Sequence, residues 1–247
     1  MEIEEAARAI LKSKKSVALT GAGISVESGI PDFRSPGGLW SKYDPLEYGH
    51  IGSFRSNPGK VWKMLLEIDQ LLDRANPNVA HDVLAELEKR GFLNAVITQN
   101  IDSLHQKAGS VNVIEYHGHN RSLRCEACGK TYPKSEVDFS KIPPVCACGG
   151  LLRPEFVFFG EPIPSRERQL AETAATGCDV MLVIGTSGSV APANYLPHIA
   201  KRHGATIVEI NPGETELPKN IIDITIREKA GSALKKILEY INSETKK

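Results

Sequence analysis

The feature that most limits the fold of this chain is a series of short apolar runs, each followed by glycine or by polar residues. Such runs are typical of strands buried on both faces of a parallel sheet. Segments with helical spacing alternate with them, at 3–14, 77–90 and 231–241, and Asn76 is expected to cap the second segment, with Pro77 in its first turn. The alternation predicts an α/β fold, a parallel sheet with helices on both faces. The expected strands are 16–20, 95–98, 113–116, 179–184, 205–210 and 222–226.

Four of the five cysteines occur in two tight pairs. Two residues separate Cys125 from Cys128, and one residue separates Cys146 from Cys148. Paired cysteines at this spacing are typical of a tetrahedral zinc site, and chance clustering of reduced thiols is a poor alternative. Four thiolates fill the coordination shell of zinc, so one structural zinc ion is predicted. Cys178 stands alone and is expected to be a small buried residue.

Two segments interrupt the alternation of strands and helices. Residues 34–76 are rich in glycine, proline, serine and aromatic residues, and residues 121–153 hold the cysteine pairs. Both are expected to be insertions that together form a smaller second lobe. The predicted division is a discontinuous sheet domain of 1–33, 77–120 and 154–247, a helical module of 34–76 and a zinc-binding module of 121–153.

Charge and hydropathy exclude several classes of partner. Thirty basic and thirty acidic residues give the 247-residue chain a formal net charge of zero, so no general nucleic-acid-binding surface is predicted. No apolar run approaches the roughly 18 residues that a membrane span needs, and residues 1–15 lack the pattern of a signal peptide. A cytoplasmic protein is expected, and paired cysteines in a reducing compartment favour a metal site over disulfides.

Polar or glycine-rich motifs follow the first two expected strands. Gly21-Ala22-Gly23, with Ser25 close behind, is typical of a phosphate-binding turn. A plain tight turn is an equal alternative, because Val26 occupies the position of the third glycine in the dinucleotide fingerprint. Residues 99–102, Gln-Asn-Ile-Asp, lie at the carboxyl edge of the sheet, where parallel sheets bind ligands. Capping of the next helix by the Asn or the Asp is an alternative that is compatible with ligand contact.

Further candidate residues follow the other strands. His117, directly before Gly118, is placed as a general base would be, although a single histidine is more often structural. Phe33 and Arg34 lie on a loop after the glycine-rich turn, and a surface loop with the phenylalanine in the core is the alternative. Two polar strand endings complete the set, Gly185-Thr186-Ser187 and Asn211.

Taken in this order, the motifs resemble the sirtuin (Sir2-like) family of NAD-dependent protein-lysine deacylases, in its prokaryotic form. The resemblance implies a Rossmann-like domain with a small lobe made of a zinc-ribbon module and a helical module. It also implies that NAD and an acyl-lysine peptide bind in the cleft between the lobes. Besides the four cysteines, the matching segments are 21–25, 29–34, 98–102, 117–118, 157–161, 185–187, 210–211 and 229–231.

The resemblance also assigns roles to individual residues. The implied catalytic residues are His117, Asn100 and Asp102. The implied NAD-binding residues are Gly21, Ala22, Gly23, Ser25, Phe33, Arg34, Gln99, Asn100, Ile101, Asp102, His117, Gly185, Thr186, Ser187, Asn211 and Ala230. The implied peptide-binding residues are Val157, Phe158, Phe159, Gly160, Glu161 and Val190.

The implied reaction removes acetyl groups from lysines of a protein substrate, with nicotinamide, O-acetyl-ADP-ribose and free lysine as products. NAD is then a co-substrate, and the enzyme is expected to be a monomer. Leu65 and Ile68, after Trp62, stand where family members that prefer acidic acyl groups carry tyrosine and arginine, so acetyl or longer neutral acyl groups are expected. The alternatives are a mono-ADP-ribosyltransferase and a non-catalytic module that binds NAD or nucleic acid.

Overall fold

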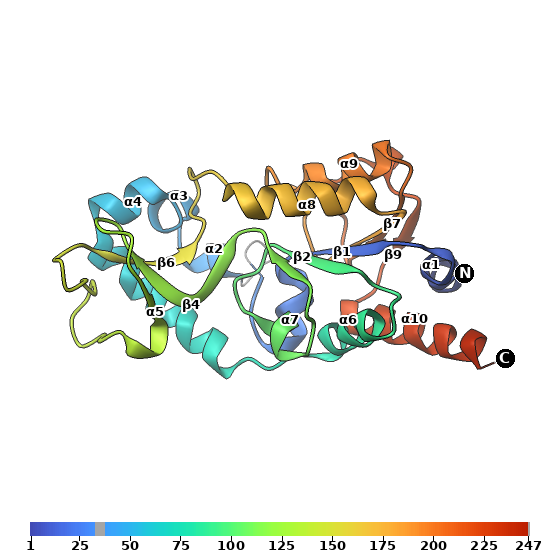
Figure 1. Ribbon diagram of the computed structural model, residues 1–247, viewed down its shortest axis with the longest axis horizontal. Helices are drawn as coiled ribbons and strands as arrows, with labels where there is room; N and C mark the ends of the chain where they lie inside the picture. The colour runs from blue at the N-terminus through green and yellow to red at the C-terminus, as the bar shows by residue number, and fades with distance from the viewer. Residues whose placement is uncertain (33–37, 247) are drawn as a thin grey trace.

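The computed structural model describes residues 1–32 and 38–246, which form a large lobe around a sheet and a smaller lobe beside it (Figure 1). None of the helices in these residues is long and apolar enough to cross a membrane. The helices are α1 (Glu2–Lys12), η1 (Ala22–Ser28), α2 (Leu39–Lys42), α3 (Pro45–Tyr48), α4 (Ile51–Ser56), α5 (Pro58–Arg74), α6 (Val79–Lys89), α7 (Leu104–Lys107), η2 (Lys134–Glu136), α8 (Ser165–Gly177), α9 (Tyr195–Arg202), η3 (Lys219–Ile221) and α10 (Ala230–Thr245). The strands are β1 (Ser16–Thr20), β2 (Ala95–Thr98), β3 (Val113–Glu115), β4 (Gly118–Cys125), β5 (Thr131–Pro133), β6 (Leu152–Phe156), β7 (Val180–Ile184), β8 (Thr206–Ile210) and β9 (Ile224–Ile226).

The large lobe contains a six-stranded sheet in the order β3-β2-β1-β7-β8-β9. Every neighbouring pair is parallel, so the predicted α/β fold is confirmed. When the six strands are numbered without those of the small lobe, the order is 3-2-1-4-5-6, which is typical of doubly wound dinucleotide-binding domains. The order reverses between β1 and β7, and ligands of such sheets bind beside the carboxyl ends of the strands at that reversal.

Helices cover both faces of this sheet (Figure 1). Successive residues of β1 point to opposite faces, as the geometry of a strand requires. Ala18 packs with the apolar residues of α1, α6 and α10, whereas Val17 and Leu19 pack with those of α8 and α9. All five residues of β1 are buried, which explains why its centre, Val17–Leu19, is a continuous apolar run and does not alternate with polar residues.

Two sequence expectations for the helices need correction. Helix α6 begins at Val79, with Asn78 and not Asn76 as its cap. The Asn78 side chain accepts a hydrogen bond from the Ala80 N–H at 2.9 Å and also donates to the Ile24 carbonyl at 2.8 Å. The cap thus ties α6 to η1, a contact between distant segments that local sequence does not reveal. Helices α8 and α9 were not predicted.

The small lobe has its own apolar core. Strands β5, β4 and β6 form an antiparallel sheet in that order. Its buried residues pack with those of α4 and α5 in one cluster. At the centre, the Trp62 indole N–H of α5 donates to the Leu152 carbonyl of β6 at 3.1 Å. The two inserted segments are therefore held together by a shared core.

Candidate functional site

Three glycines bring the ends of β1 and β7 into direct backbone contact. The Gly21 N–H donates to the Ile184 carbonyl at 3.0 Å, and the Gly23 N–H donates to the Gly185 carbonyl at 2.8 Å. A β-carbon on Gly23 would lie 2.8 Å from the Gly185 Cα, and one on Gly185, whose φ is +60°, would lie 2.4 Å from the Ile24 nitrogen. Close packing therefore requires these glycines, and the element that follows Gly21 is a 3₁₀-helix, η1.

A buried polar network joins η1 to the segment after β2. The Ser25 hydroxyl donates to Asp102 Oδ2 at 2.7 Å. The Asn100 amide donates to the Gly21 carbonyl at 3.1 Å and to Ser25 Oγ at 3.2 Å. Asp102 Oδ1 also accepts from the Leu104 N–H, the first of α7, at 2.9 Å. The N-cap of α7 is Ser103, so neither Asn100 nor Asp102 is the cap, and Asp102 contacts both the start of α7 and Ser25.

The polar ends of β7 and β8 adjoin the same network. The Gln99 amide donates to Thr186 Oγ1 at 3.1 Å, and the Asn211 amide donates to the Thr186 carbonyl at 3.0 Å. Ser187 and Ser189 share a hydrogen bond of 2.8 Å between their hydroxyls. The carboxyl ends of β1, β2, β7 and β8 therefore contribute to one continuous polar surface at the sheet reversal.

His117 directly precedes β4, beside this surface. Its Nδ1 is 3.0 Å from the Gln99 carbonyl oxygen. A carbonyl can only accept, so Nδ1 carries the proton and Nε2 holds a free lone pair. Burial lowers the pKa of His117 and outweighs the opposing effect of the Gln99 carbonyl. The imidazole is therefore neutral at neutral pH, which is the form a general base requires.

Two further histidines, which were not predicted, lie behind the network. His81 of α6 and His105 of α7 pack edge to face, with ring centroids 4.9 Å apart. The His105 Nε2 is 2.9 Å from Thr20 Oγ1, at the end of β1. Burial, and secondarily the neighbouring His81, lowers the pKa of His105 to about 3. Both rings are buried behind the polar network. The sequence indicates them only as histidines on helix faces that are otherwise apolar.

The predicted peptide-binding segment, 157–161, is held in place by the small lobe. Phe158 is buried and packs on Phe54, with ring centroids 5.1 Å apart. Arg153 of β6, 2% exposed, donates to Glu161 at 2.5 and 2.6 Å and lies over the Phe158 ring. The Phe158 N–H donates to Glu161 Oε2 at 3.0 Å. The side chains of Phe158 and Glu161 therefore anchor the segment to the small lobe.

The backbone of the same segment bridges the lobes. The Val157 N–H donates to the His117 carbonyl at 2.9 Å. The Phe159 N–H donates to the Gly49 carbonyl at 2.9 Å, and the Phe159 carbonyl accepts from the Ile51 N–H at 3.0 Å. The segment is thus pinned both to the candidate base and to the loop before α4, while the Phe159 side chain is 41% exposed.

The remaining predicted residues are dispersed around the site. Ile101 and Val190 are partly buried. Ala230 is buried at the start of α10, where the Gly231 N–H donates to Glu27 of η1 at 2.9 Å. Phe33 and Arg34 lie outside the described residues.

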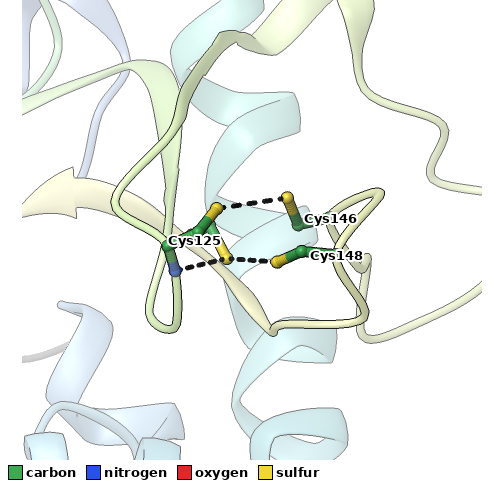
Figure 2. Close-up of side chains that lie close together, drawn as sticks. Cys125, Cys146 and Cys148 are labelled. Carbon is green, nitrogen blue, oxygen red and sulfur yellow. Dashed lines mark hydrogen bonds between the residues drawn. The ribbon is translucent and has the colours of Figure 1, made fainter.

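The four paired cysteines converge at one end of the small lobe. Cys125 and Cys148 point toward each other (Figure 2). The sulfur atoms are 3.6 Å apart for Cys125 and Cys148 and 3.7 Å apart for Cys128 and Cys146, and all four lie within 4.8 Å of one another. Tetrahedral zinc with Zn–S bonds of about 2.3 Å requires sulfurs separated by about 3.8 Å. The donor set and its spacing therefore fit one structural zinc ion.

Neighbouring donors lower the pKa of two of these thiols, Cys125 and Cys146, whereas the other three sulfurs outweigh the Gly150 N–H and raise the pKa of Cys148 to about 12. The backbone N–H of Cys148, together with the Tyr132 hydroxyl at 3.0 Å, lowers the pKa of Cys146 to about 6. The same hydroxyl contact raises the pKa of Tyr132 to about 12. Zinc binds thiolates and not thiols, so a cysteine that is already ionised at neutral pH favours binding.

The strand order and the cluster at the sheet reversal define a Rossmann-like protein with a four-cysteine lobe. Residues 21–192 match the model of the Sir2 family, and the chain belongs to that family. An "NAD-dependent protein deacetylase" of Thermodesulfovibrio yellowstonii is 49% identical over 240 residues, which cover 95% of this chain and 93% of the relative.

Solved structures agree with this membership. A Sir2 homologue in complex with NAD is 43% identical and has a TM-score of 0.90, covering 98% of this chain and 94% of the other. A Sir2 variant solved with a deacetylated p53 peptide and 3′-O-acetyl-ADP-ribose is 38% identical and has a TM-score of 0.92, covering 97% of this chain and 98% of the other.

Proposed function

We propose that this chain is an NAD-dependent protein-lysine deacetylase that transfers the acetyl group from lysine to ADP-ribose. The observation that carries the proposal is the joined set of a neutral His117, the Ser25–Asn100–Asp102 network and the pinned segment 157–161. Relatives with 49% and 45% identity bear the name NAD-dependent protein deacetylase, and the sirtuin resemblance of the motifs agrees with that activity.

The carboxyl edge of the sheet is the proposed NAD site. NAD supplies an activated bond between ribose and nicotinamide when it is bound. Gly21, Ala22 and Gly23 would face the pyrophosphate, where the small residues leave room for it. The Asn100–Asp102 segment and Ser25 would line the nicotinamide end. The adenosine half and the nicotinamide ribose would contact Gln99, Gly185, Thr186, Ser187, Asn211 and Ala230. The family resemblance also assigns Phe33 and Arg34 to this site.

His117 is the proposed general base. Its Nε2 lone pair would accept a proton released by a ribose hydroxyl, while Nδ1 remains fixed on the Gln99 carbonyl. Burial keeps the ring neutral, so no proton has to leave before it can act. Help of this kind contributes about 10²- to 10⁴-fold to a reaction rate.

The substrate is proposed to be an acetylated protein segment that binds in an extended form between 157–161 and Val190, by addition of a strand. Leu65 is buried, and Ile68 is partly buried against the same small-lobe core. An apolar wall cannot pair with a carboxylate. We expect acetylated peptide to be processed faster than its succinylated twin, as measured by kcat/KM for the two peptides. Faster turnover of the succinylated peptide would contradict this preference.

The direct test is mass spectrometry of an acetyl-lysine peptide incubated with the protein, with and without NAD. The expected result is a loss of one acetyl group per lysine, strictly dependent on NAD, with formation of O-acetyl-ADP-ribose. His117→Ala is expected to lower the rate by about 10²- to 10⁴-fold. His203→Ala is the matched control, because His203 is exposed in the turn after α9.

Two other outcomes would point to the alternative functions. ADP-ribose attached to a protein acceptor, without an acetylated peptide, would indicate a mono-ADP-ribosyltransferase. Unchanged activity of His117→Ala, or NAD binding without any turnover, would indicate a non-catalytic module. Neither alternative has an observation of its own that favours it over deacetylation.

The organisation of the molecule is part of the same proposal. We infer helical and zinc-binding modules at 34–76 and 121–153, supported by their common apolar core, with the remainder of the chain as the NAD-binding domain. We propose a monomer that works in the cytoplasm without membrane partners, and the zero net charge accords with the absence of nucleic-acid partners. Light scattering of the purified protein tests the oligomeric state.

A further inference from the structure

Ser103 has an uncommon backbone conformation directly beside the candidate site. Its φ is 60°, and among the residues that the structure describes it is the one non-glycine residue with positive φ. The left-handed region brings the β-carbon of an L-residue too close to a carbonyl oxygen. Such a conformation persists where the surroundings determine it. Ser103 lies between Asp102 and α7, so its φ sets the path of the Asn100–Asp102 segment.

Arg121 of β4 contacts the Ser103 side chain. Its Nη1 donates to Ser103 Oγ and to Glu115 Oε1, both at 2.5 Å. Its Nη2 donates to Glu115 Oε2 at 2.7 Å. Glu115 is the last residue of β3 and lies in register with Thr98 of β2. One planar guanidinium therefore fixes Ser103 relative to the edge of the large sheet, a geometry that a lysine cannot reproduce.

An irregularity in β4 permits this reach. The pairing of β4 with β6 shifts its register between Gly118 and Leu123. Leu123 is buried in the core of the small lobe, whereas Arg121 is exposed and turns to the large sheet. Bulges of this kind beside functional sites redirect side chains.

We propose that Arg121 is a positioning residue, which holds Ser103 in its left-handed conformation and thereby fixes the Asn100–Asp102 segment at the nicotinamide end of the NAD site. The inference rests on the proposed deacetylase function. Without Arg121, Ser103 relaxes toward an ordinary φ, and Asp102 loses its alignment with Ser25. The adenosine half of the site, formed by the ends of β7 and β8, does not depend on this contact.

The test compares Arg121→Ala and Ser103→Ala with the control Arg124→Ala, which removes an exposed charge from the same strand. The readouts are the inhibition constant of nicotinamide, kcat/KM for NAD, and the Kd of ADP-ribose by calorimetry. Arg121→Ala and Ser103→Ala are each expected to weaken nicotinamide inhibition and kcat/KM roughly tenfold, which corresponds to about 1.4 kcal/mol. The Kd of ADP-ribose, which lacks nicotinamide, stays within about twofold of the wild-type value, a difference under 0.5 kcal/mol.

Rescue by glycine separates this role from a general effect on folding or charge. Glycine adopts positive φ without a brace, so Ser103→Gly/Arg121→Ala should recover to within about threefold of Ser103→Gly, a difference under 1 kcal/mol. A double variant as impaired as Arg121→Ala overturns the proposal, and so does an Arg121→Ala protein that behaves like Arg124→Ala. Parallel weakening of ADP-ribose binding also overturns it.

A second variant, Glu115→Gln, tests the proposal if Arg121→Ala does not fold. Zinc content and Tm show whether each variant is folded. If Arg121→Ala does not fold, Glu115→Gln retains one acceptor for Arg121 and should weaken nicotinamide inhibition by a smaller factor. No change in Glu115→Gln then overturns the proposal. Failure of the proposed function is a different result, because wild-type protein would then show no NAD-dependent deacetylation at all.

Discussion

His117 and its neighbour Gly118 join the candidate base to the candidate peptide segment. The His117 imidazole is fixed on Gln99, and its backbone carbonyl accepts from Val157. Gly118 has a φ of +75°, and a β-carbon there would lie 2.2 Å from the Glu155 carbonyl oxygen. The close approach of β4 to β6 at this point thus depends on the absence of a side chain. The His-Gly pair seen in the sequence is explained by packing as well as by chemistry.

Activity is expected to fall at acidic pH in a way set by His117. Burial lowers its pKa below the ordinary value of about 6.5. The base is lost only when the ring is protonated, so the acidic limb of kcat/KM should have its midpoint below pH 6.5. A pH profile of peptide deacetylation measures this limb, and the residual activity of His117→Ala should lack it. A midpoint above the ordinary histidine pKa would contradict the assignment.

His105 should make the folded state sensitive to acid. Its pKa is about 3 in the folded protein and about 6.5 in the unfolded chain, so only the unfolded chain binds a proton between these values. The free energy of unfolding is then at its full value above about pH 6.5 and falls by roughly 1.4 kcal/mol per pH unit toward pH 3. Urea unfolding between pH 7 and 4 tests this. His105→Gln should flatten the slope and His203→Gln should not; equal slopes for all three proteins would refute the prediction.

The segment 157–161 is shaped by an element of the small lobe, β6, through the pairing of Arg153 with Glu161. Burial disfavours the charged carboxylate, but hydrogen bonds from Arg153 and from the Phe158 N–H outweigh it and lower the pKa of Glu161. A buried guanidinium that loses its partner is costly, and this one also supports the Phe158 ring. The segment therefore owes its shape to a contact made outside the cleft.

Glu161→Gln is expected to loosen this segment. The free energy of unfolding should fall by about 2 kcal/mol, because a charge-assisted hydrogen bond to a buried arginine is lost. KM for the peptide should rise while KM for NAD changes little, as steady-state kinetics with each substrate varied would measure. Glu167→Gln, which removes a carboxylate paired with the exposed Arg166 on α8, is the matched control. Equal effects on the two KM values would contradict a local role.

Elements with a clear pattern of large apolar residues could be predicted from the sequence, and elements without such a pattern could not. Strands β1, β2 and β7 appear as continuous apolar runs, and polar residues at their carboxyl ends could be assigned to one edge of the sheet. Helix α8 buries only alanines on its inner face, namely Ala171, Ala174 and Ala175, so its pattern is weak. Contacts such as those of Arg121 and Arg153 depend on strand register, which the sequence does not state.

At the scale of the whole molecule, the four cysteines stabilise a lobe that carries part of the site. The four sulfurs lie within 4.8 Å of one another, and a four-thiolate shell leaves no position for substrate. Zinc therefore acts through structure. The apolar cluster shared by both insertions transmits this support to the segment 157–161, since Phe158 belongs to that cluster.

Removal of zinc should abolish activity through unfolding of the small lobe. Chelation is expected to lower Tm and to eliminate deacetylation, because structural zinc sites contribute about 10 to 16 kcal/mol to folding in zinc-finger peptides. Reconstitution with cobalt(II), which also accepts tetrahedral thiolates, should restore the rate to near its zinc value. Circular dichroism and peptide turnover measure both steps. A rate that changed strongly with the identity of the metal would argue for a catalytic ion.

The central position of β1 in the large sheet has a consequence for how the chain acquires its structure. Val17 pairs with Ala95 on one side and with Met181 on the other. During synthesis the second partner emerges only after the entire small lobe has been made. Until then, the backbone N–H and C=O groups on one edge of β1 have no partner strand. Val17 and Leu19 also lack the helices α8 and α9 that later pack on them. An open strand edge favours pairing with other chains, so the late arrival of β7 is expected to leave the nascent chain exposed to aggregation.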